Sequence, residues 1–215
     1  LSNILYLYIP RETVVYANTL VYVVMCIKEL AFGLVLGYVT TAFLNLVMTS
    51  GQIIDMQMGF GMAGVTDAQS DTQVPVVGNF LSIALLISFF GVNGHLQLID
   101  LLRATILQVP VGSVVISPKI AYAAVEVFAL TFVLAVNVAM PVIAAALVGD
   151  LAMGILLRTV PQMNVFVVGI PLKIIIGLLV LMAIMPMFVI FTQTIFSNMF
   201  SSIEQMFGSI IGVAT

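Results

Sequence analysis

The sequence predicts an all-α protein of the membrane type, in which long apolar helices cross a bilayer or pack against partner subunits. Hydrophobic residues make up 62% of the 215 residues, and charged residues make up only 7%. A soluble domain carries about 25% charged residues, so the charges here are too few to cover a water-exposed surface. The long apolar runs do not alternate in polarity as the strands of a membrane barrel do, which favours helices.

Four stretches without a charged residue are long enough to cross a bilayer, which takes about 20 apolar residues. These charge-free stretches are residues 30–54, 72–99, 127–149 and 174–203. Two further helical stretches are predicted at Thr13–Ile27, which leads into the first span, and at Ile143–Arg158. The chain is therefore predicted to be a series of apolar helical spans.

Prolines interrupt these spans. Seven of them lie in or beside the apolar stretches: Pro75, Pro110, Pro118, Pro141, Pro161, Pro171 and Pro186. A proline inside a helix removes a backbone hydrogen bond and bends the helix, and in lipid a broken backbone persists only where protein or water covers it. Two interpretations follow. The spans could be kinked helical hairpins with re-entrant segments packed against other subunits, or they could be ordinary kinked transmembrane helices.

Several charged residues lie within or beside the apolar spans, where an unpaired charge is costly. They are Lys28, Glu29, Glu126, Asp150, Arg158 and Lys173. They could form a proton or ion pathway, or they could pair structurally, and structural pairing is favoured because no cluster of carboxylates falls on one helix face. Lys173 is predicted to follow a helix break at Pro171 and to begin the last long span. A carboxylate partner is expected for it, because a cation at a helix N-terminus is unfavourable.

Residues able to support catalysis are almost absent from the sequence. His95 is the only histidine, and a lone histidine without suitable companions does not make a metal site. Asn93-Gly94 is a turn signal, so His95 is predicted to begin the next helix as a hydrogen-bonding turn residue. No phosphate-binding glycine loop, nucleophile elbow or cysteine-pair motif occurs. We therefore expect no enzyme, no catalytic residue, no metal and no cofactor, and the net charge of −3 argues against nucleic-acid binding.

A glycine- and methionine-rich segment, residues 58–74, follows the first span. Glycine permits positive φ angles and methionine adapts to irregular shapes, as a soft, displaceable seal would require. A plain connecting loop is the favoured interpretation from composition alone, since long loops are common and movable seals are rare. If the segment closes a channel, its closing residues are expected to be Met58, Gly59, Phe60, Gly61, Met62, Gly64 and Asp67.

Three groups of residues carry a resemblance to a known family. The first is Gly51-x-Ile53-Ile54-x-x-Gln57-Met58-Gly59, and the second is Asn93-Gly94-His95. The third and longest is Pro161-Gln162-Met163-Asn164-Val165-Phe166-Val167-Val168-Gly169-Ile170-Pro171-Leu172-Lys173. In this order, and over nearly the whole chain, the sequence resembles the FliR/SctT family of type III export-gate subunits, and the third group looks flagellar.

The resemblance implies a subunit that joins FliP and FliQ in the flagellar export gate, at the basal body in the bacterial inner membrane. Unfolded flagellar proteins would pass through this gate, with FlhB and FlhA as neighbouring proteins and lipids around it. Residues 1–118 would be FliP-like and residues 119–215 would be FliQ-like. Residues 58–74 would lie in the lumen and help to plug the closed channel, while the other family-motif residues, Lys173 included, would serve assembly.

Two departures from the family pattern bear on these expectations. The family usually carries a further hydrophobic segment before the matched part, and this segment is expected to be missing from residues 1–118. The family often has Asp-Pro in the plug loop, whereas this chain has Asp67-Ala68, which would make that turn less rigid. An alternative function is a polytopic transporter or channel for small solutes or ions, since such proteins also use broken helices and midplane charges.

Overall fold

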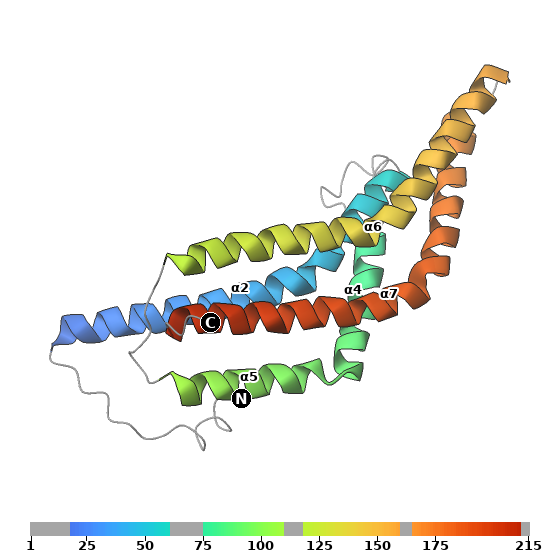
Figure 1. Cartoon of the computed structure of the whole chain (residues 1–215). Helices are drawn as coiled ribbons and strands as arrows, with labels where there is room; N and C mark the ends of the chain where they lie inside the picture. The colour runs from blue at the N-terminus through green and yellow to red at the C-terminus, as the bar shows by residue number, and fades with distance from the viewer. Residues whose placement is uncertain (1–17, 61–74, 110–117, 160–164, 212–215) are drawn as a thin grey trace, which may run out of the picture. The chain divides into compact units, whose positions relative to one another are not determined.

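The computed structural model describes residues 18–60, 75–109, 118–159 and 165–211, and all regular secondary structure in these ranges is helical. In chain order the helices are α2 (Thr19–Met58), α4 (Val76–Gly91), α5 (Gly94–Gln108), α6 (Lys119–Thr159) and α7 (Val165–Ile211), as labelled in Figure 1. Three of them, α2, α6 and α7, are long and apolar enough to cross a membrane. The predicted all-helical membrane fold is therefore confirmed.

The three long helices extend well beyond the predicted spans. They contain 40, 41 and 47 residues. At about 1.5 Å per residue they are about 60 to 70 Å long, which is about twice the 30 Å thickness of the hydrocarbon core of a bilayer. Prolines do not divide them, because α6 continues through Pro141 and α7 continues through Pro171 and Pro186.

The predicted span 72–99 is divided into two helices. α4 and α5 are bent by 66° where they meet, and together they could make up one further span. Asn93, which stands between them, has a positive φ of 58°, a left-handed conformation that asparagine adopts more readily than most residues. The turn predicted at Asn93-Gly94 is confirmed, and His95 stands in the first turn of α5 as expected.

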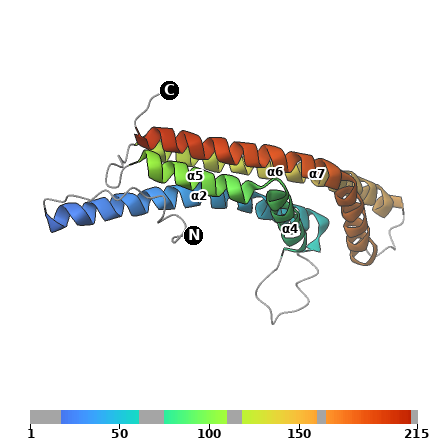
Figure 2. The ribbon, with the colours of Figure 1, turned by 90° about the horizontal axis from the view of Figure 1, so that it is seen from below.

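The described residues fall into two compact units, and each unit takes segments from both sides of residue 118. The first unit is made from residues 1–43, 89–130 and 195–215, as far as these are described. Within it, segments of α2, α5, α6 and α7 run lengthwise beside one another (Figures 1 and 2). The proposed division into a FliP-like and a FliQ-like part remains a prediction.

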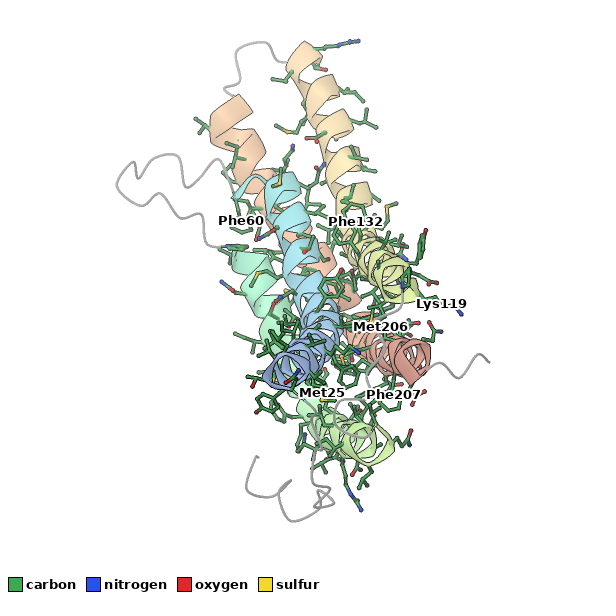
Figure 3. The ribbon with its side chains drawn as sticks, turned by 90° about the vertical axis from the view of Figure 1, so that its left-hand side faces the viewer. Met25, Phe60, Lys119, Phe132, Met206 and Phe207 are labelled. Atoms are coloured by element: carbon green, nitrogen blue, oxygen red, sulfur yellow. The ribbon has the colours of Figure 1, made fainter. Side chains whose placement is uncertain are left out.

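Aromatic side chains form much of the core of the first unit. Phe89 at the end of α4 meets Phe196 of α7 edge-on, with ring centroids 5.3 Å apart. Phe32 of α2 lies 6.4 Å from Phe207 of α7, which is labelled in Figure 3. Such aromatic pairs contribute about 0.5–1.5 kcal/mol beyond the area that they bury. The end of α7 is thereby joined to both α2 and α4.

The second unit is made from residues 44–88 and 131–194. In it the last part of α6 and the first part of α7 lie beside one another as a helical hairpin (Figures 1 and 2). Buried apolar side chains from all four helices form its core: Leu46, Val47, Ile54 and Met58 from α2, Val77, Leu81 and Leu85 from α4, Leu134, Val138, Val142 and Met153 from α6, and Leu181 and Phe188 from α7.

Large apolar side chains also cover the outside of the helices. Leu30, Tyr122 and Ile190, for example, are 66%, 78% and 69% exposed, and side chains radiate outward from every helix in Figure 3. Exposed apolar surface on this scale marks contact with lipid or with another protein. The chain therefore needs a covering along its helices.

Candidate functional site: the junction of α2 and α4

The predicted seal begins at the end of α2, and the structure describes this end in detail. The last helical residue is Met58, after which Gly59 has a positive φ of 84° and donates its backbone N–H to the carbonyl of Met56 at 3.3 Å. Glycine takes this conformation without the steric cost that a Cβ atom brings. Phe60 follows and is half-buried (Figure 3). The remaining candidates lie outside the described residues: Gly61, Met62, Gly64 and Asp67.

α2 and α4 cross with their backbones in contact. A Cβ atom added to Gly51 would lie 2.0 Å from the Cα of Gly78 and 2.3 Å from its backbone nitrogen. A Cβ atom added to Gly78 would lie 2.9 Å from the sulfur of Met48. No residue larger than glycine fits at Gly51 unless the two backbones move apart. The family-motif glycine therefore has a structural role as the crossing point of the two helices.

One turn after Gly51, the carboxylate of Asp55 caps the start of α4. Asp55 is only 7% exposed, and its Oδ1 accepts a hydrogen bond from the backbone N–H of Val77 at 3.1 Å, with weaker interactions from the N–H groups of Val76 and Gly78. The first N–H groups of a helix have no partner within the helix, and a side-chain oxygen placed there satisfies one of them. Among the described residues, Oδ2 is buried without a hydrogen-bond partner.

Asp55, which directly follows the charge-free stretch 30–54, was not among the site residues predicted from the sequence. The signal was present, because residues four apart share a helix face and Asp55 follows the motif residue Gly51 at that distance. The sequence does not show what this face meets, since the partner helix begins beyond the loop.

The end of α2 also packs against α7. Met58 is fully buried, and a Cβ atom added to Gly177 would lie 2.6 Å from both the Cε and the Cγ of Met58. Gly59 is near Ile170, whose Cγ2 would lie 3.8 Å from a Cβ at Gly59. The neighbouring motif residue Gln57 is half-buried. Met58 thus has a packing role within the chain, and its part in closing a channel stays a prediction.

Lys173 forms an ion pair with Asp150 of α6, so the carboxylate partner expected for it is found within the chain. The reason given for that expectation was wrong, because α7 begins at Val165 and continues through Pro171. Lys173 therefore lies inside a helix and not at its start. The two side chains are 28% and 41% exposed, and they join the arms of the α6–α7 hairpin.

Gly169, which belongs to the same motif as Lys173, is buried. The motif residues that lie outside the description are Pro161, Gln162, Asn164 and the side chain of Phe166.

The other charged candidates differ in exposure. Glu126 and Arg158 are exposed, whereas Lys28 and Glu29 are half-buried. Over the residues that the structure describes, no group of three or more His, Cys, Asp or Glu side chains is arranged to hold a metal ion.

The motif Asn93-Gly94-His95 has a local structural explanation. A Cβ atom added to Gly94 would lie 2.3 Å from the ring of Phe89, so a larger residue fits at the start of α5 only if that ring moves. The His95 ring lies 5.1 Å from that of Phe90. Its Nδ1 is buried and has no hydrogen-bond partner in the described part of the chain, so the predicted hydrogen-bonding role is not supported at this nitrogen.

Comparison with known families matches residues 1–199 to the family described as bacterial export proteins, family 1. The chain belongs to this family. Its relatives include the flagellar biosynthetic protein FliR of Bacillus subtilis, which is 33% identical over 196 residues, covering 90% of this chain and 75% of the relative. FliR of Escherichia coli is 32% identical over 177 residues, covering 82% and 68%. FliR of Aquifex aeolicus is 31% identical over 197 residues, covering 89% and 74%.

Family membership confirms the resemblance carried by the three motifs, all of which lie within the matched residues. The chain is a bacterial export-family protein whose helices are long and apolar enough to cross a membrane. Its relatives are flagellar biosynthetic proteins. The structure places Gly51 against the start of α4, and it places Met58 and Gly59 against α7. It adds Asp55, which bonds to the start of α4.

Proposed function

We propose that the chain is a core subunit of the flagellar type III protein-export gate. With FliP and FliQ it would form the channel through which unfolded flagellar proteins leave the cell, next to FlhB and FlhA in the basal body at the inner membrane. The observation that carries this proposal is the family match over residues 1–199, together with relatives named flagellar biosynthetic protein FliR. In this proposal the chain forms part of a conduit and performs no chemical step.

The apolar surface of the long helices supports a place among other subunits. In the most hydrophobic windows of α2, α6 and α7, only 11%, 39% and 17% of the residues are buried within the chain. These helices are about 60 to 70 Å long, and a bilayer covers about 30 Å of that length. Neighbouring proteins would cover the rest in an assembled gate, whereas a transporter working alone would leave it uncovered.

The segment 58–74 is proposed to act as the plug of the closed channel. An apolar constriction blocks water and ions by dewetting, and a flexible one yields to an exported chain of any side-chain size. What supports the proposal is the start of the segment, where Met58 and Gly59 lie against α7 and the chain turns out of α2 at the positive φ of Gly59.

The test of the proposed function is co-purification. The full chain carries an affinity tag in flagellated cells and is extracted in mild detergent. FliP and FliQ are expected to remain bound, because a chain with so few charges and so much exposed apolar surface needs partners. A chain that purifies as a monodisperse single subunit, with neither protein attached, would contradict the proposal.

A further inference from the structure

Asp55 is a buried carboxylate in an apolar helix, and such residues have two physical explanations. It could carry protons or ions through the membrane part of the protein, or it could satisfy the backbone of a neighbouring helix. Among the described residues it makes no ion pair, and its hydrogen bond goes to the backbone of α4. The question is therefore which property of the side chain matters, its negative charge or its acceptor oxygen.

The geometry at the start of α4 favours the acceptor oxygen. Val77 is the second residue of α4, and the N–H at this position is one of those that donate to the side-chain oxygen of a helix cap. The residue before α4 is Pro75, which has no side-chain oxygen, and its carbonyl already accepts the N–H of Asn79 at 3.1 Å. The cap that most helices obtain from the preceding residue is supplied here by a different helix.

A cap that one helix supplies to another at their crossing also fixes the position of the second helix against the first. The contact between Gly51 and Gly78 sets how closely α2 and α4 approach. The hydrogen bond from Val77 to Asp55, one turn further along α2, sets the rotation and register of α4 at that crossing. With both contacts in place, the chain leaves α2 at Gly59 and enters α4 at Val76 at fixed positions.

We infer that Asp55 is a positioning residue that fixes the start of α4 against the end of α2, and that it acts through the oxygen that caps α4 and not through its charge. The inference rests on the proposed function, since the two chain ends that it holds are those that flank the proposed plug. It assigns a role to a residue outside the set predicted from the sequence.

The experiment compares Asp55→Asn with Asp55→Ala in the full chain within the whole gate. Asparagine keeps the Oδ1 acceptor and the shape of the side chain, whereas alanine removes both, and asparagine caps helices about as well as aspartate. Export, measured as secreted flagellin per assembled gate, is expected to stay close to wild type in the asparagine variant. In the alanine variant it is expected to fall about fivefold or more, with raised ion permeability. Asp100→Ala, which removes an exposed carboxylate of α5, is the matched control and is expected to behave as wild type.

Two results would overturn the inference. One is an asparagine variant as defective as the alanine variant in correctly assembled gates, since the charge would then be required. The other is an alanine variant with normal export and normal permeability. If the alanine variant does not assemble, the pH profile of export decides. A cap predicts the same profile for asparagine as for wild type, and a proton carrier predicts a changed one. Failure of the proposed function is a separate outcome, because the wild-type chain would then not retain FliP and FliQ.

Discussion

Replacing Gly51 by alanine tests whether the α2–α4 crossing determines the stability of this part of the chain. The added Cβ atom would lie 2.0 Å from the Cα of Gly78, and an ordinary contact begins at 3.4 Å, so the two backbones must separate by about 1.4 Å. A flexible side chain could rotate away from such a clash, but backbone atoms cannot. A shift of this size would also break the 3.1 Å hydrogen bond between Val77 and Asp55.

The expected net effect of Gly51→Ala is a loss of about 2 kcal/mol. Overpacking of a tight contact costs about 1–3 kcal/mol, and the lost hydrogen bond costs about 1 kcal/mol more. Against this, alanine is favoured over glycine in a helix by about 1 kcal/mol. The clash is therefore decisive, because it exceeds the gain in helix propensity.

The assay is the temperature at which half of the gate complex, purified in mild detergent, loses its bound partners. Gly154→Ala in α6 and Gly91→Ala in α4 are matched controls, since no residue that the structure describes lies within 4 Å of a Cβ atom added at either position. The Gly51→Ala complex is expected to dissociate at a temperature several degrees below wild type, and the controls at or above it. If Gly51→Ala dissociates at the same temperature as wild type, the close backbone contact does not exist in the assembled protein.

Two further predictions concern the ion pair and the plug. Lys173→Met is expected to lower the yield of assembled gate and to lower motility in proportion, because Asp150 is left unpaired between the arms of the hairpin. Normal assembly with lost export would instead place Lys173 in the export pathway. Deletion of residues 62–73 is expected to make assembled gates leak ions and dyes while FliP and FliQ stay bound, and a deletion gate that assembles and stays tight would refute the plug.

The helices themselves were predictable because their signals are local. Long runs without charge predicted α2, α6 and α7, and Asn93-Gly94 predicted the turn before α5. The effect of proline was overestimated at Pro171, where α7 continues. A proline removes one backbone hydrogen bond, and in a helix of 47 residues the remaining bonds and the packing against α6 outweigh that loss.

The α2–α4 junction was not predictable, because its contacts join positions far apart in the sequence. Gly51 is explained by Gly78, and Asp55 is explained by the unsatisfied backbone of α4. Neither residue carries a local signal for its partner. A glycine in an apolar helix or an aspartate at the end of a span fits many structures, and only the crossing of the two helices selects one.

The glycines of α2 are of two kinds: one contacts another helix of this chain, and two are open to contact with another protein. Gly51 is in backbone contact with α4, but no described residue lies within 4 Å of a Cβ atom added at Gly33 or Gly37. Glycine in a helix interior costs about 1 kcal/mol relative to alanine, and packing against the described part of the chain does not offset this cost at either position. In membrane helices, small residues at this spacing allow another helix to approach closely. Exposed Leu30 and Leu34 flank them, so α2 has the composition of a helix that meets a second protein along its middle, as a subunit of an export gate would.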